Sequence, residues 1–118
     1  MIAYQNVRGL NTKLSRLFVD SFDFDFSVVA FTETWLKAHV FDSEILSSKY
    51  VIHRRDRSHR TGGGVLIAVD TSLPSERIAL VETNIEFVAT SIIIGRSKLF
   101  VTCSYIPPNS EPTIFAGY

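Results

Sequence analysis

The stretch VVAFTETWL, Val28 to Leu36, joins a wholly apolar run to a single carboxylate, Glu33. Consecutive apolar residues of this kind indicate a strand that is buried on both faces. Because an unpaired buried carboxylate is costly, Glu33 lies either at a solvent-exposed edge or opposite a positive charge. A further alternative places it in the first turn of a helix, ETWLK, where the helix dipole favours an acid.

The residues before this stretch complete a β-α-β unit. The predicted elements are a strand at 1–6, a helix at 11–22 and a second strand at 26–33. Asn11 is a candidate N-cap for the helix. Strands joined by a crossover of this length are typically parallel neighbours, so we expect Asn6 and Glu33 to leave the sheet at the same carboxyl edge. Ligands of α/β proteins gather at that edge.

The rest of the chain is rich in short strands. A helical turn is predicted at 40–46, and further strands at 49–54, 65–70, 76–82, 86–95 and 98–106. Turn residues between the later strands favour antiparallel neighbours. The predicted fold class is therefore α/β, in a single domain over residues 1–118. Few amphipathic helices are present to cover the sheet, so we expect uncovered apolar strand faces that promote self-association.

The composition is that of a globular protein, and the chain has no net charge. Twelve basic and twelve acidic residues cancel, so contact with nucleic acid would need a local patch. The basic residues gather in RRDRSHRTGGG, residues 54–64, whose arginines could equally form a solvated loop. The arginines of this segment are Arg54, Arg55, Arg57 and Arg60.

The single cysteine, Cys103, excludes an internal disulfide and predicts a reducing compartment, the cytoplasm or nucleus. Its apolar surroundings favour a packed core residue over a reactive thiol. The sequence shows neither a signal peptide nor an apolar run long enough for a membrane span.

Three strand ends carry polar side chains that suit metal and phosphate chemistry. Asn6 and Glu33 offer an amide and a carboxylate oxygen, which are ligands of a hard cation such as Mg²⁺. Tyr105 lies near the end of the last predicted strand. Each has a plain structural alternative, since Asn6 could be a turn residue and Tyr105 an ordinary strand aromatic. Gly62 to Gly64 lack the lysine and following helix of a phosphate loop, which excludes that site.

Four motifs occur together and in order between Ile2 and Pro108: NVRGLNTKL, AFTETWL, RTGGGVLIAV and SYIPP. In this combination the chain resembles the endonuclease domain of non-LTR (LINE-type) retrotransposons, within the endonuclease/exonuclease/phosphatase superfamily. The resemblance implies a two-layer β-sandwich flanked by helices. It also implies Mg²⁺-dependent phosphodiester hydrolysis that nicks target DNA. By this resemblance Asn6 supports the metal, Glu33 ligates Mg²⁺ and Tyr105 contacts the scissile phosphate.

The chain departs from that family after Tyr105. The family's later GDFN-like segment and its final aspartate–histidine pair are not among these 118 residues. We therefore expect the N-terminal half of a nuclease domain, with a missing C-terminal half as its partner and no activity alone. The alternative is a non-catalytic module that binds nucleic acid or protein through its arginine-rich loop. A third alternative, a peptide with no function, is compatible with the composition.

Overall fold

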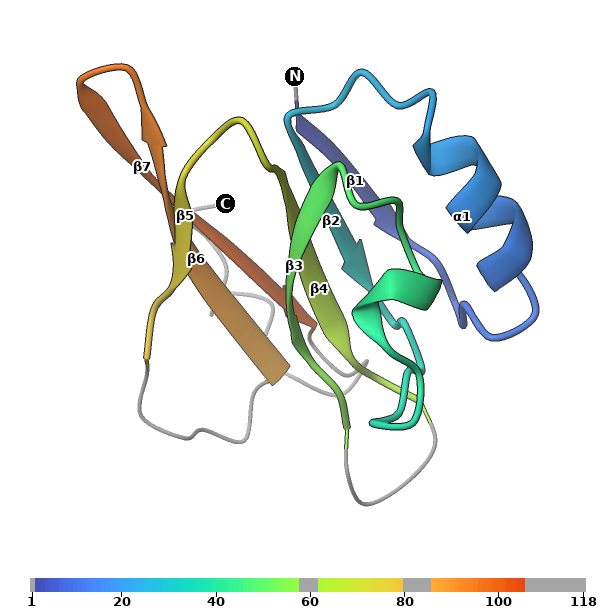
Figure 1. Ribbon diagram of the computed structural model, residues 1–118. Helices are drawn as coiled ribbons and strands as arrows, with labels where there is room; N and C mark the ends of the chain where they lie inside the picture. Colours follow the sequence, from blue (N-terminus) through green and yellow to red (C-terminus); the bar gives the residue numbers. More distant parts are fainter. Residues whose placement is uncertain (1, 58–61, 80–85, 106–118) are drawn as a thin grey trace.

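The computed structural model describes residues 2–57, 62–79 and 86–105, which form a small mixed α/β domain (Figure 1). In order, its elements are β1 (Ile2–Asn6), α1 (Leu14–Ser21), β2 (Val28–Thr32), the 3-10 helix η1 (Asp42–Glu44), β3 (Tyr50–Arg55), β4 (Val65–Asp70), β5 (Ser75–Arg77), β6 (Glu86–Ile94) and β7 (Ser97–Tyr105). The α/β class and the early β-α-β unit are confirmed. Within these ranges no helix has the length and apolarity that crossing a membrane requires.

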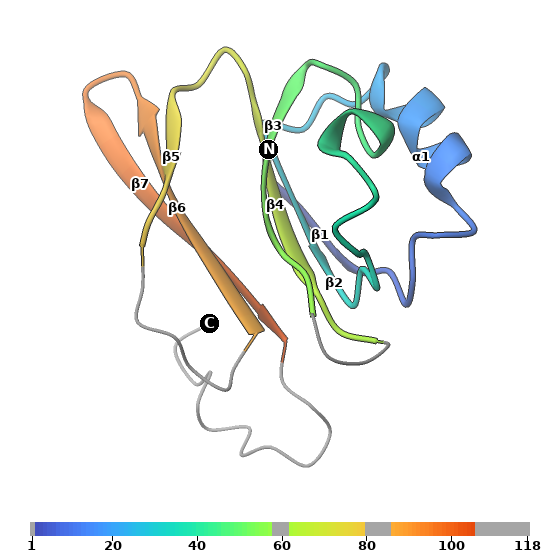
Figure 2. The same ribbon diagram turned by 60° about the horizontal axis from the view of Figure 1, so that its bottom comes forward.

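The strands form two sheets. The first has the order β1-β2-β4-β3, with β1 parallel to β2 and β4 antiparallel to both of its neighbours. The second is the antiparallel meander β5-β6-β7. Figure 2 shows the two sheets face to face, with α1 and η1 on the opposite side of the first sheet. The inner strands of the first sheet, β2 and β4, are therefore covered on both faces, whereas the edge strand β1 is largely exposed.

Alternating side chains divide the core into two clusters, one on each face of the first sheet. In β2, Val29 and Phe31 belong to the cluster on the helical side, whereas Val28 and Ala30 belong to the cluster between the sheets. This alternation follows from the two-residue period of a strand. Cys103 is buried in the inter-sheet cluster, which raises its thiol pKa to about 11. The prediction of a packed core cysteine is confirmed.

The expectation of uncovered strand faces is wrong for β4 but holds for the ends of β6 and β7 that meet at their turn, and self-association stays a prediction. All five residues from Val65 to Val69 have 0% of their surface exposed, because β6 and β7 cover the face that the helices leave open. Exposed apolar side chains of strands are found on β1, on β3 and around the β6–β7 turn: Ile2, Tyr4, Val51, Ile93, Ile94, Leu99 and Phe100. The expectation fails because helices are not the only available cover: three short strands supply the second layer.

Two local predictions are also wrong. The N-cap of α1 is Lys13, and Asn11 instead donates from its side-chain Nδ2 to the Trp35 carbonyl oxygen at 3.3 Å. The segment ETWLK is not helical, because Glu33 and Trp35 have positive φ angles of 55° and 58°. The helix-dipole explanation of Glu33 therefore does not apply.

Three consecutive glycines lead the chain into β4. Gly62, Gly63 and Gly64 have φ angles of 87°, 66° and 91°, a region that side chains disfavour. A Cβ atom on Gly64 would lie 2.4 Å from Thr34 Oγ1. The last glycine is thus required both by its backbone conformation and by the close approach of a neighbouring strand.

Alanine substitutions at Gly64 and Gly95 separate the effect of positive φ from the effect of the Thr34 contact. We expect Gly64→Ala to lower the free energy of unfolding by about 2 kcal/mol or more, through positive φ and the steric conflict together. Gly95→Ala is the matched control, because Gly95 has a φ of 61° and no atom within 4 Å of the position that a Cβ would occupy. The control should cost about 1 kcal/mol. Urea unfolding measures both, and equal losses would contradict the role of the Thr34 contact.

Candidate functional site

All four strands of the first sheet begin or end in one row. Asn6 pairs with Thr32, Thr32 pairs with Val65, and Val65 pairs with Arg55. These are the last residues of β1, β2 and β3 and the first residue of β4. We call this end of the sheet, with the segments 7–13, 33–37, 54–57 and 62–64 that adjoin it, the carboxyl edge.

Backbone hydrogen bonds continue the sheet beyond the row. They join the segment after β1 to the segment after β2, and the latter to the glycines before β4. The bonds are Val7 N to Thr32 O (3.0 Å), Gly9 N to Glu33 O (2.7 Å), Leu10 N to Thr34 O (2.9 Å), Thr34 N to Gly64 O (3.2 Å) and Trp35 N to Gly63 O (2.8 Å). The carboxyl edge is therefore a hydrogen-bonded extension of the sheet.

Strained backbone is concentrated at this edge. Arg8, Glu33 and Trp35 are the non-glycine residues with positive φ in the described ranges. Each such conformation costs of order 1–3 kcal/mol and persists only where its surroundings impose it. Conformations of this kind cluster at functional sites, so their concentration singles out the carboxyl edge from the rest of the molecule.

The two predicted metal-binding side chains both lie here. Glu33 is half-buried and Asn6 is exposed, and neither side chain has a hydrogen bond or ion pair with any residue of 2–57, 62–79 or 86–105. Next to them, Tyr4 Oη lies 3.1 Å from Thr32 Oγ1. The described residues contain no group of three or more His, Cys, Asp and Glu side chains arranged to hold a metal. A cation here would have one carboxylate, an amide oxygen and water as ligands.

Tyr105, the third predicted site residue, ends β7. The Cys103 thiol donates to the Phe31 carbonyl oxygen at 3.5 Å, which places the end of β7 against the end of β2. Both ribbon views show β7 ending at the same end of the molecule as β1 and β2 (Figures 1 and 2). The structure thus brings the backbone of Tyr105 to the end that carries Asn6 and Glu33.

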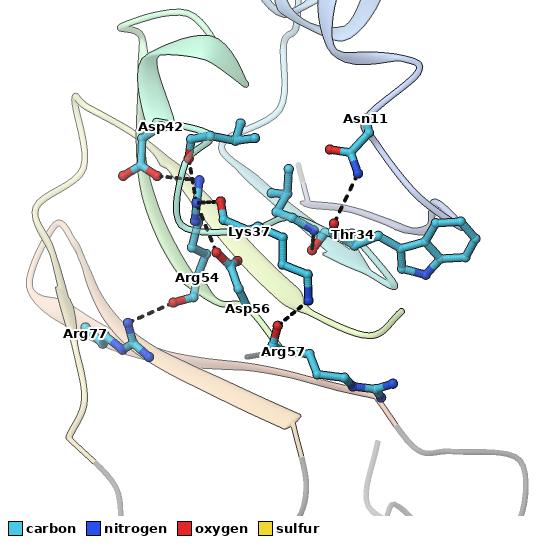
Figure 3. A network of polar contacts seen from close by, with 11 residues as sticks. Asn11, Thr34, Lys37, Asp42, Arg54, Asp56, Arg57 and Arg77 are labelled. Carbon is cyan, nitrogen blue, oxygen red and sulfur yellow. Dashed lines mark hydrogen bonds and ion pairs between the residues drawn. The ribbon is translucent and has the colours of Figure 1, made fainter. Parts of the chain in front are cut away.

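The arginines of the basic segment have different environments. The Arg54 side chain is only 13% exposed, and its guanidinium contacts carboxylates of Asp42 at 3.1 Å and Asp56 at 3.0 Å (Figure 3). It also donates to the carbonyl oxygens of Lys37 at 3.0 Å and Val40 at 2.6 Å. Arg54 therefore binds the loop before β3 to the sheet, and its guanidinium has little surface to offer a ligand.

The other arginines lie at the carboxyl edge or outside the described residues. Arg55 is the last residue of β3 and Arg57 follows two residues later, both half-buried. Arg60 lies outside the described residues. The segments of the carboxyl edge contain six basic and two acidic residues in a chain with no net charge. The basic ones are Arg8, Lys13, Lys37, Arg54, Arg55 and Arg57.

Sequence reasoning missed three of these cations and Trp35. Arg8 and Lys13 follow β1, Lys37 follows β2, and Trp35 stands two residues after Glu33. The signal was available, because residues that follow parallel strands meet at one edge. The predicted nucleic-acid contact was assigned to the run at 54–57 alone, because positive charge is denser there along the sequence.

Neither a protein-family model nor a curated protein matches this chain.

The Arg54 contacts predict a large stability difference between two arginines. We expect Arg54→Met to lower the free energy of unfolding by about 3 kcal/mol, because it leaves the Asp56 carboxylate, whose side chain is only 18% exposed, without its cation. Arg16→Met is the matched control: Arg16 is 89% exposed and lies 3.7 Å from Asp20, so its loss should cost under about 0.5 kcal/mol. Urea unfolding tests this, and similar small losses in both variants would show that Arg54 is not structural.

His53 predicts a pH dependence of stability. Burial, and secondarily the Arg77 charge, lower its pKa from the ordinary 6.5, and its Nε2 lies 3.0 Å from Ser75 Oγ across the two sheets. Below pH 6.5 the unfolded chain therefore binds a proton that the folded chain resists. Stability should fall as the pH drops from 6.5 through the lower folded-state pKa.

The variant His53→Gln should flatten this loss, and His39→Gln, at an exposed loop position, should retain it. Urea midpoints measured at about pH 7.5 and about pH 5.5 give the comparison. An unchanged slope in His53→Gln would contradict the assignment.

Proposed function

We propose that this chain is the N-terminal part of a Mg²⁺-dependent DNA endonuclease domain, of the type found in non-LTR retrotransposons. The proposal includes the finer fold assignment, that the two sheets are part of the two-layer sandwich of the endonuclease/exonuclease/phosphatase superfamily. Four motifs at matching places in the sequence support it, as does the α/β architecture with parallel first strands.

One observation carries the proposal. Asn6 ends β1, and Glu33 directly follows β2, the parallel neighbour of β1. Both side chains lack partners within the described ranges and stand at an edge with an excess of four positive charges. Two oxygen-bearing side chains suit a hard cation, and the surrounding cations suit a polyanion. A site that binds a cation and phosphate groups side by side is what phosphodiester hydrolysis requires.

A carboxylate and an amide oxygen are donors of the kind that Mg²⁺ accepts. Mg²⁺ prefers oxygen ligands, keeps several waters and commonly binds proteins through one or two carboxylates. Glu33 would be its carboxylate ligand, with Asn6 beside it. When bound, the ion would neutralise charge on a phosphate oxygen. The neighbouring lysine and arginine side chains would attract and orient the DNA backbone.

These 118 residues alone are expected to bind DNA without cleaving it. The family's general base, transition-state amide and histidine have no counterparts in this sequence. Loss of a single such group typically costs about 10²–10⁴-fold in rate. The second candidate function, a metal-independent nucleic-acid module, is favoured by the same cationic edge and differs only in the role of Glu33.

The two functions are distinguished by metal-dependent DNA binding. We expect Mg²⁺ to strengthen binding of the chain to a dye-labelled duplex, measured by fluorescence anisotropy with Mg²⁺ or with EDTA. Glu33→Gln should weaken the Mg²⁺ response by about ten-fold or more, because it removes the only carboxylate ligand. Glu44→Gln, an exposed glutamate of η1, makes the same charge change and should leave the response intact.

A second pair of variants tests the phosphate contacts. Replacing both Arg55 and Arg57 with glutamine should weaken binding with or without Mg²⁺ and flatten its dependence on salt. If DNA binding is strong but indifferent to Mg²⁺ and to Glu33, the metal-independent module is the correct function. Plasmid nicking by the 118 residues alone would contradict the expected lack of activity.

A further inference from the structure

Trp35 is an exposed aromatic residue held in a strained backbone conformation. Its surface is 41% exposed and its φ angle is 58°, a region in which large side chains are rare. Its N–H donates to the Gly63 carbonyl oxygen at 2.8 Å, and its own carbonyl accepts a hydrogen bond from Asn11 Nδ2 at 3.3 Å. These two contacts hold the backbone of Trp35 in place at the carboxyl edge.

Gly9 provides a flat surface for the indole. A Cβ atom on Gly9 would lie 2.4 Å from Cε3 and 2.8 Å from Cζ3 of Trp35, so the six-membered ring lies directly on the glycine backbone. The pyrrole nitrogen, Nε1, lies on the side of Gly62, 4.0 Å from the corresponding Cβ position. The indole thus spans the segments after β1 and before β4 while much of its surface stays open to solvent.

Positive charge surrounds this aromatic surface. Arg8 is exposed and adjoins Gly9, and Arg57 Nη1 lies 3.4 Å from the Cβ position of Gly62, which Nε1 of Trp35 also approaches. The Glu33 carbonyl accepts the hydrogen bond of Gly9 N–H, so the proposed metal ligand and the indole share one neighbour. An accessible aromatic ring among cations is the arrangement that binds bases and phosphates of single-stranded nucleic acid.

We propose that Trp35 is a stacking platform for one unpaired nucleobase of a DNA strand whose phosphates contact Arg8, Arg57 and the cation at Glu33. This inference rests on the proposed function and specifies its substrate further. Every base has a π-face, so the platform accepts any sequence but requires a base that is free of its duplex partner. The site therefore favours single-stranded or locally unpaired DNA over intact duplex.

Trp35 is the only tryptophan of the chain, so its fluorescence reports on this surface alone. The test titrates the full chain with two dye-free single-stranded oligonucleotides of equal length and phosphate number, oligothymidylate and its abasic tetrahydrofuran analogue. Stacking should quench the Trp35 emission with oligothymidylate and not with the analogue. Dye-labelled versions of both give the affinities by anisotropy.

Two variants separate stacking from packing. Trp35→Leu keeps an apolar side chain over Gly9 but removes the ring, and we expect it to weaken oligothymidylate binding by about ten-fold while changing abasic binding by less than about two-fold. Trp35→Phe keeps a ring and should retain affinity within about three-fold. Urea unfolding establishes that each variant is folded. Should the leucine variant not fold, the quenching comparison on the unaltered chain decides.

The possible outcomes distinguish failure of the stacking platform from failure of the proposed function. Equal quenching and equal affinity for the two oligonucleotides would overturn the platform and leave Trp35 as a cover for Gly9. If Mg²⁺-dependent binding sensitive to Glu33→Gln persists in that case, the proposed function stands and the platform alone fails. Quenching by bases without any Mg²⁺ or Glu33 dependence would overturn the nuclease proposal and retain the platform. Absence of DNA binding would overturn both.

Discussion

Strand β4 is buried on both faces, and the rest of the structure depends on this burial. Leu66 and Ala68 pack in the cluster on the helical side, while Val65, Ile67 and Val69 pack between the sheets. A strand with no access to water must satisfy its backbone by pairing on both sides, here with β2 and β3. That double pairing sets the register that aligns the four strand ends in one row.

The alignment of the four strand ends allows strained backbone conformations at the carboxyl edge, because hydrogen bonds support them. The glycines before β4 and the left-handed residues after β1 and β2 are joined by hydrogen bonds that continue the sheet. Strain of this kind survives because the buried core and these hydrogen bonds outweigh it. The same contacts give Glu33 and Trp35 fixed positions before any ligand arrives, which reduces the entropy that binding would lose.

Some basic side chains at the carboxyl edge are enclosed and stabilise the fold, whereas others are exposed to solvent. Arg54 is enclosed by two carboxylates and two carbonyl oxygens, so it stabilises the fold. Arg8, in contrast, is exposed beside the indole, and Arg55 ends the row of paired residues. Arginines that are neighbours in the sequence therefore have different environments in the fold. The cationic surface is better described as a spatial group that includes Arg8, Lys13 and Lys37 than as the arginine run at 54–57 alone.

The sequence by itself determined the burial of the apolar run at 28–32 on both faces, the β-α-β unit, and the shared edge of Asn6 and Glu33. These follow from local periods and from the parallel direction that a crossover helix imposes. Only the tertiary structure decided that β4 inserts between β2 and β3, that Asn11 bonds to Trp35, and that Arg54 is internal. Those features depend on atoms distant in sequence, whose positions no local pattern specifies until the sheets have packed.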